Sequence, residues 1–161
     1  MVIEHPTIDD LKEIVETSYV WYQSMDFDSV GKHFDRQVVT DLWKDSILSP
    51  FKYDVLVARE KNTIVGAFGI VYSTSHTWFK GILQGYELVF HADPRLPRFT
   101  QGKVMLSLLD AMVPKIKARN PDAVFIGTDC RYPEVAGMLK RKGALPVMTT
   151  MMLKYTGVTN G

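Results

Sequence analysis

Three consecutive strand patterns occupy the centre of the chain, and this arrangement constrains the fold most. The stretches 54–59 and 64–72 are apolar and rich in β-branched residues, and a short polar turn separates them. A third and longer strand pattern covers 78–91. Gly66 and Gly69 lie inside the second pattern, where glycine is typical of a bulge or of close approach by another backbone. We therefore predict an antiparallel meander whose first two strands form a hairpin.

Helical patterns flank this meander on both sides. Apolar residues recur at helical spacing in four segments, and the predicted helices cover about 7–19, about 30–46, 101–119 and 133–142. In the second segment Phe34, Val38 and Leu42 are four residues apart, which is helical spacing. Shorter strand patterns occur at 2–4, 123–127 and 145–155. The order β-α-α-β-β-β-α-β-α-β predicts an α+β fold of three layers, α/β/α, with a mixed, mostly antiparallel sheet flanked by helices.

Length and charge limit the remaining choices. A chain of 161 residues with 46% hydrophobic residues is long enough for one domain with its own core, which we place at 1–155, followed by a flexible tail at 156–161. The net charge is +1, which excludes a nucleic-acid or anionic-membrane partner recruited by bulk charge. No apolar run approaches the roughly 20 residues of a membrane span, so we expect no membrane partner.

The cysteine and histidine content bears on compartment and metals. Cys130 is the one cysteine, which excludes an internal disulfide and a cysteine-based metal cluster, and predicts a buried, inert thiol in a reducing compartment such as the cytoplasm. The first six residues lack a basic region followed by an apolar stretch, so we expect no signal peptide. The four histidines have no metal-ligand spacing, which predicts surface or hydrogen-bonded histidines and no metal site.

Three segments resemble one known family. They are 3–11, which matches a first strand and capped helix, the hairpin 55–69, and 135–148, which matches a last helix and the strand after it. In this order and spacing they are similar to the GNAT acyltransferase superfamily over nearly the whole chain. The sequence also resembles the divergent GNAT-like proteins that tailed phages encode.

The resemblance implies an activity and a cofactor. Members of the superfamily bind acetyl-CoA and transfer its acetyl group directly to an amine, so we expect an N-acetyltransferase acting on a small-molecule or protein amine, in a monomer or homodimer. The resemblance implies that the strands 86–91 and 123–127 are splayed neighbours. The pantetheine arm of the cofactor would lie between them and bond the backbone of the first strand, at Val89 and Phe90.

The expected pyrophosphate loop departs from the family pattern. In that loop, bare backbone N–H groups at a helix N-terminus hold phosphate oxygens, and glycines permit close approach. The aligned segment has Thr100 in place of the expected arginine, and its expected glycines fall on Gln101, Lys103 and Met105. Gly102 is one residue out of register. The candidate cofactor contacts here are Arg98, Thr100, Gln101, Gly102 and Lys103.

Glu87 and Tyr132 are the candidate catalytic residues. Glu87 falls in the strand that often carries the family's general base, and its apolar neighbours in sequence should raise the pKa of its carboxyl. The alternative is a carboxylate that faces solvent or pairs with a lysine. The family's general acid, a tyrosine of the last helix, aligns with Leu139, and Tyr132 is the nearest candidate in its place. The alternative for Tyr132 is a surface residue.

The acceptor region and the overall function leave two alternatives open. The aromatic residues Trp21, Tyr22, Phe27 and Phe34 are typical of a core, although in the family this region borders the acceptor site. The intact strand-helix order and Glu87 favour an acetyltransferase. The altered loop and the missing tyrosine favour a GNAT-like binding or structural protein that has lost acetyl-CoA binding.

Overall fold

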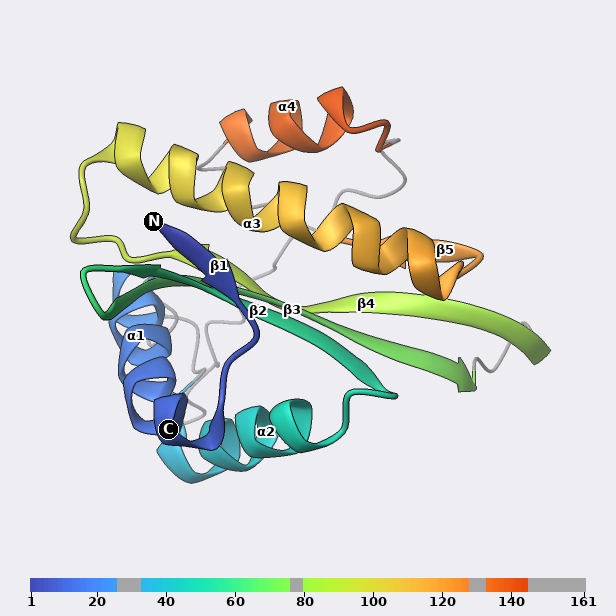
Figure 1. Cartoon of the computed structure of the whole chain (residues 1–161), viewed down its shortest axis with the longest axis horizontal. Helices are drawn as coiled ribbons and strands as arrows, with labels where there is room; N and C mark the ends of the chain where they lie inside the picture. The colour runs from blue at the N-terminus through green and yellow to red at the C-terminus, as the bar shows by residue number, and fades with distance from the viewer. Residues whose placement is uncertain (26–32, 76–79, 128–132, 145–161) are drawn as a thin grey trace, which may run out of the picture.

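The computed structural model describes residues 1–25, 33–75, 80–127 and 133–144 (Figure 1). The predicted strand at 145–155, the predicted tail and Phe27, Trp78, Cys130 and Tyr132 lie outside these residues. The strands are β1 (Val2–Glu4), β2 (Tyr53–Glu60), β3 (Thr63–Ser75), β4 (Lys80–Ala92) and β5 (Ala123–Phe125). The helices are a 3-10 turn (Ile8–Asp10), α1 (Leu11–Ser24), α2 (Arg36–Leu48), α3 (Arg98–Arg119) and α4 (Pro133–Arg141).

The five strands form one mixed sheet in the order β1-β2-β3-β4-β5. Neighbours from β1 to β4 are antiparallel, and β5 pairs with β4 in parallel. Helices α1 and α2 cover one face of the sheet, and α3 and α4 cover the other (Figure 1). The predicted α+β class, the central meander and the three layers are thereby confirmed.

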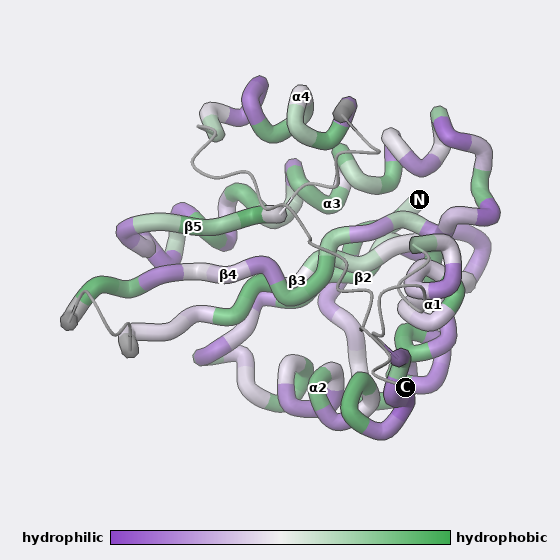
Figure 2. The backbone as a smooth tube through the Cα atoms, turned by 180° about the vertical axis from the view of Figure 1, so that it is seen from behind, coloured by the Kyte–Doolittle hydropathy of each residue, from purple (hydrophilic) through white to green (hydrophobic). Residues whose placement is uncertain are grey.

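Two apolar cores fill the space between these layers. Phe68, Ile70, Leu108 and Met112 are fully buried between the sheet and α3, and Met138 of α4 joins them. The second core, on the α1 and α2 face, contains Ile14, Trp43, Val55, Val57 and Ile64. The helices carry alternating hydrophilic and hydrophobic segments along their length, as expected when each helix buries one face (Figure 2).

Val38 and Leu42 do not form the buried face of α2. Val38 is 62% exposed and Leu42 is 37% exposed. The stripe one residue later, at Val39, Trp43 and Ile47, packs into the second core instead. Both stripes repeat every four residues, so spacing alone does not separate them. The choice favours the stripe with the larger buried area, because Trp43 is only 2% exposed.

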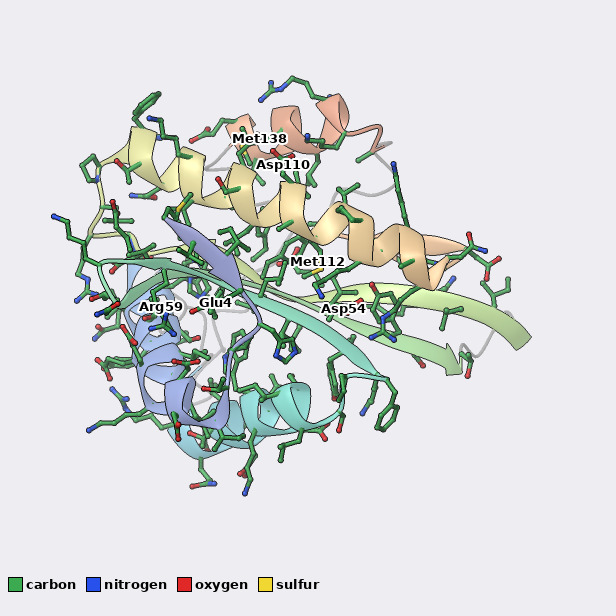
Figure 3. The ribbon with its side chains drawn as sticks, in the orientation of Figure 1. Glu4, Asp54, Arg59, Asp110, Met112 and Met138 are labelled. Atoms are coloured by element: carbon green, nitrogen blue, oxygen red, sulfur yellow. The ribbon has the colours of Figure 1, made fainter. Side chains whose placement is uncertain are left out.

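Two arginines tie the sheet to its neighbours. The Arg59 side chain of β2 bonds Glu4 of β1 at 2.7 Å and Asp10 before α1 at 2.6 Å. Arg119, at the end of α3, bonds Asp54 of β2 at 2.6 Å. Figure 3 shows Glu4 and Arg59 beside β1, and Asp54 under the C-terminal part of α3. All three contacts are partly buried hydrogen bonds between charged groups, and such bonds are stronger than those between neutral groups.

Gly66 lets α3 approach the sheet closely. A Cβ atom at this position would lie 2.6 Å from Val104 Cγ1 of α3 and 2.8 Å from the His91 carbonyl oxygen. The predicted reason for a glycine in this strand, close approach of another element, is therefore confirmed.

We expect Gly66→Ala to lower the free energy of unfolding by about 1–3 kcal/mol, because α3 or β4 must move to admit the methyl group. Gly102→Ala is the matched control, since its added Cβ would meet nothing within 4 Å. In a helix interior that change should raise stability by up to about 1 kcal/mol. Urea denaturation of both variants measures the difference, and equal stabilities would contradict the close approach.

His91 is buried, and neither of its ring nitrogens has a hydrogen-bond partner among the described residues, contrary to the prediction of surface or bonded histidines. Its side chain is 1% exposed. The ring stacks on Trp21 of α1, with centroids 5.3 Å apart and planes 15° apart. Burial lowers the pKa of His91 to about 4, against a weaker opposing effect of Asp93. The imidazole is therefore neutral in the folded protein at pH 7.

We expect His91→Phe to stabilise the protein, because it keeps the stacked ring and removes two unsatisfied nitrogens. The unfolded histidine titrates near 6.5, so the wild-type chain loses stability as the pH falls from about 6.5 towards about 4. The gap between variant and wild type should therefore widen between pH 8 and pH 5 in urea denaturation. His33→Phe, at an exposed position, is the control. A gap independent of pH would contradict a neutral, buried His91.

Candidate functional site

Strands β4 and β5 pair over a short distance and then separate. The paired residues are Gln84, Gly85 and Tyr86 of β4 with Ala123, Val124 and Phe125 of β5. Beyond Tyr86, β4 continues to Ala92 without a strand partner on this side among the described residues. The predicted sheet neighbours are therefore present, and their pairing ends after Tyr86 and Phe125. We call β4 from Glu87 onward, together with the residues that follow Phe125, the wedge; its backbone groups need other hydrogen-bond partners.

A β-bulge shapes β4 beside the wedge. Gly69 of β3 is opposite Val89, and the next residue, Ile70, is opposite Glu87, so Leu88 is an additional residue in β4. A bulge changes the direction of the side chains around it. Phe90 is 7% exposed and stacks on Phe68 with ring centroids 4.3 Å apart. The Phe90 side chain thus belongs to the core, and Val89 packs against the second core. Any cofactor contact of Val89 or Phe90 would come from their backbone.

Glu87 reaches across the start of the wedge. Its Oε2 atom accepts a hydrogen bond from the Gly127 backbone N–H at 2.7 Å. Burial raises the pKa of Glu87 to about 7, while the bond from Gly127 acts in the opposite direction. Near neutral pH the carboxyl group therefore exists in both protonation states. A carboxyl with this pKa can accept a proton from one group and return it to another.

The N-terminal end of α3 differs from the predicted loop. The family's loop would carry bare N–H groups at 100–105, but here α3 already begins at Arg98, with Pro97 as its N-cap residue. The N–H groups of Thr100 and Gln101 donate to the Pro97 carbonyl at 2.8 and 3.0 Å. Gly102 and Lys103 lie further inside the helix, where N–H groups bond the carbonyl four residues earlier. The family's cradle of bare N–H groups is therefore not formed by 100–105.

Local contacts explain why the helix begins early. Pro97 has the fixed φ that suits a helix entrance, −53° here. The Gln101 side chain turns back and donates to the carbonyl oxygens of Leu96 at 2.7 Å and Pro94 at 3.3 Å. These bonds hold the loop before α3 against its first turn. In the sequence Gln101 stands at a position where the family has glycine, and its hydrogen bonds to this loop could not be predicted from that alignment.

A shallow groove runs between the first turns of α3 and helix α4. Its lining comprises Arg98, Gln101, Gly102 and Met105 of α3 with Glu134, Val135 and Met138 of α4. Figure 3 shows Met138 between the two helices. The Arg98 guanidinium bonds Glu134 Oε1 at 2.9 and 3.0 Å. Gly102 contributes open space, because an added Cβ would meet no atom within 4 Å.

The cations at this end of α3 are exposed. The Lys103 ammonium lies 4.5 Å from the centre of the Phe99 ring, which is 75% exposed. Arg98 is also mostly exposed, with 68% of its side chain accessible. Thr100, the position of the family's arginine, is half-buried. The end of α3 therefore offers positive charge and an aromatic surface next to the groove.

The other candidate residues fall into separate places. Leu139, at the family's tyrosine position, is 7% exposed in the core. Tyr22 is buried and Phe34 contacts its ring at 5.3 Å, consistent with a core role for the aromatic segment. The described residues contain no group of three side chains suited to a metal ion. None of the described helices combines the length and apolar character needed to span a membrane.

Gly127 and Glu134 belong to this site and were not predicted from the sequence. Gly127 contributes through its backbone N–H, which leaves no signal in side-chain chemistry. Glu134 pairs with a residue 36 positions earlier, so the contact depends on how α3 and α4 pack.

Comparison with known proteins gives a match at the level of structure. No protein-family model matches the sequence, and no curated protein matches it. A tetramutant of the BH1408 protein from Bacillus halodurans is 16% identical, with a TM-score of 0.71 over 95% of this chain and 99% of that one.

Two further solved structures are acetyltransferases. An aminoglycoside acetyltransferase from an uncultured soil metagenomic sample, in complex with sisomicin, is 16% identical, with a TM-score of 0.65 over 98% of this chain and 96% of the other. A predicted acetyltransferase from Clostridium acetobutylicum, solved with acetyl-CoA, is 15% identical, with a TM-score of 0.66 over 94% of each chain. At these identities the likeness shows the fold alone, so this chain has the same fold as these solved structures.

Proposed function

We propose that this protein is an acetyl-CoA-dependent N-acetyltransferase whose general base is Glu87. The observation that carries the proposal is a half-buried carboxyl with a pKa raised to about 7, located where β4 and β5 separate. A general base is most effective when its pKa lies near the working pH. The structural similarity to acetyltransferases supports the same reaction class.

The described residues fit acetyl-CoA in two places and fall short in a third. The wedge leaves the backbone of β4 from Glu87 onward without a strand partner on one side, which suits an amide-bearing arm. The groove beside Gly102 is open, and Arg98 and Lys103 supply positive charge near it. The N–H groups of Thr100 and Gln101 are already bonded to Pro97, so phosphate binding would depend mainly on these side chains.

The chemistry assigned to the chain itself is proton transfer. Acetyl-CoA would supply an activated acetyl group for direct transfer to an amine. Glu87 Oε1 would accept a proton from the acceptor's ammonium group, directly or through one water, since an amine attacks only when deprotonated. Tyr132 remains a candidate proton donor. The proposed acceptor class is a small-molecule or protein amine, which the similarity in fold to an aminoglycoside acetyltransferase and to a ribosomal-protein-alanine N-acetyltransferase supports.

A second function has one specific observation in its favour. Because the N–H groups of Thr100 and Gln101 are already bonded to Pro97, this helix end offers fewer donors to a pyrophosphate than the family loop. A GNAT-like binding or structural protein without cofactor would need none of these donors. Measurement of acetyl-CoA binding separates the two functions.

We expect acetyl-CoA to raise the midpoint of thermal unfolding, because a ligand that binds only the folded state stabilises it by about 2.7 kcal/mol at a hundredfold excess over Kd. Gly102→Leu should remove most of this shift by filling the groove. Ala118→Leu is the control, since Ala118 is exposed on α3 away from the groove lining. Absence of any shift at millimolar acetyl-CoA would instead support the binding or structural protein.

We expect Glu87→Gln to lower kcat by about 10²–10⁴-fold, because the amide cannot accept the proton, while the Kd for acetyl-CoA stays within a few-fold. In the wild type kcat/KM should rise with pH through about 7, as the base loses its proton. Release of free thiol from acetyl-CoA, with an aminoglycoside or a peptide amine as acceptor, measures both. Glu60→Gln, on an exposed strand end, is the control. Unchanged turnover in the Glu87 variant would remove this residue from the mechanism.

A further inference from the structure

The hydrogen bond between Glu87 and Gly127 lies at the point where strand pairing ends. The last ladder pair is Tyr86 with Phe125, so Glu87 is the first residue of β4 beyond the ladder. Gly127 comes two residues after Phe125 on the other side of the wedge. A side chain of one strand thus bonds the backbone of its neighbour, 2.7 Å from oxygen to nitrogen, where the backbones no longer bond each other.

The bond uses one carboxylate oxygen and leaves the other available. Oε2 accepts the Gly127 N–H, and Oε1 has no hydrogen bond in the described part of the chain. A carboxylate whose one oxygen is held by a fixed backbone donor has a defined orientation, because the donor restricts rotation of the carboxyl plane. The free oxygen then presents its lone pairs in one direction.

We propose that the backbone N–H of Gly127 is the positioning group for Glu87, holding Oε2 so that Oε1 is presented to the acceptor amine. The proposal rests on the proposed function only in assigning the amine as the proton donor. Gly127 acts through Glu87 and need not touch the substrate itself. The geometry of the bond exists without cofactor or acceptor.

The electrostatics of the site agree with this role. Burial disfavours the carboxylate, and the Gly127 N–H is the group that favours it. Within the described residues no charged side chain contributes to the shift of the Glu87 pKa. The protonation of Glu87 should therefore respond directly to the presence of this one N–H.

The chain offers a matched pair of substitutions at Gly127. An added Cβ would lie 3.6 Å from Glu87 Oε2, an ordinary van der Waals contact, and the φ angle of Gly127 is outside the left-handed region. Gly127→Ala therefore keeps the N–H with little strain. Gly127→Pro removes the N–H, because proline has no backbone donor.

The first experiment uses the ligand-free protein. In wild type, the amide proton shift of Gly127 measured by NMR should change with pH with a midpoint near 7, as Glu87 ionises. Glu87→Gln should abolish this midpoint while leaving the amide protected from exchange, because the glutamine oxygen can still accept. A Gly127 shift that is constant from pH 5 to pH 9 in wild type would overturn the proposal.

The second experiment compares the two substitutions. The carboxyl carbon of Glu87, followed by NMR, should titrate about one pH unit higher in Gly127→Pro than in Gly127→Ala, through loss of the donor. The midpoint of the kcat/KM profile should move by the same amount, with KM for acetyl-CoA changed less than kcat. Equal midpoints in folded Ala and Pro variants would overturn the proposal, and if the Pro variant does not fold, the Gly127 amide titration decides it.

These readouts separate this inference from the proposed function. The titrations of Gly127 and Glu87 need neither acetyl-CoA nor an acceptor. If both behave as expected and acetyl-CoA does not bind, the proposed function fails while the positioning bond stands. If acetyl-CoA binds and is turned over but the amide shift does not titrate, the reverse holds.

Discussion

Backbone pairing between β4 and β5 lasts for only three residues, and the candidate site depends on this limit. The antiparallel strands from β1 to β4 satisfy one another's peptide groups over most of their lengths. At the end of the β4–β5 ladder, peptide groups need partners of another kind. One of them, the N–H of Gly127, is bonded by a carboxylate. The end of the β4–β5 ladder therefore coincides with the position of a titratable group, Glu87.

The sequence predicted the fold because its signals are local and repeated. The β-branched runs of β2 and β3, separated by a polar turn, identify a hairpin without any tertiary information. The face of α2 was beyond such signals. Val38 and Val39 begin equally good four-residue stripes, and only packing of Trp43 against the second core selects one. The helix entrance at Pro97 was missed for a related reason, since Gln101 braces it through carbonyl oxygens of residues that carry no helical pattern.

The candidate site could be predicted in part. Glu87 was chosen because the resemblance places a general base in this strand and because its neighbours in sequence are apolar, and its location at the end of the β4–β5 ladder is visible in the structure. Gly127 and the groove between α3 and α4 required coordinates, because a backbone donor and an absent side chain have no chemical signature. The burial of His91 was not predicted. The spacing of the four histidines argues against a metal site, but it does not indicate which histidine is buried beside Trp21.

The close approach at Gly66 sets the distance between the groove at α3 and the wedge at β4. Val104 of α3, two residues after Gly102, packs against Gly66 of β3. Strand β3 is the neighbour of β4 in the sheet. The height of α3 above the sheet is therefore set at a contact that belongs to neither the groove nor the wedge. Gly66, which has no reactive side chain, therefore sets the distance between the groove and the wedge that a molecule bound in both places would have to cover. In this fold, the length that such a ligand needs is determined by the packing of Val104 on Gly66, outside both binding regions.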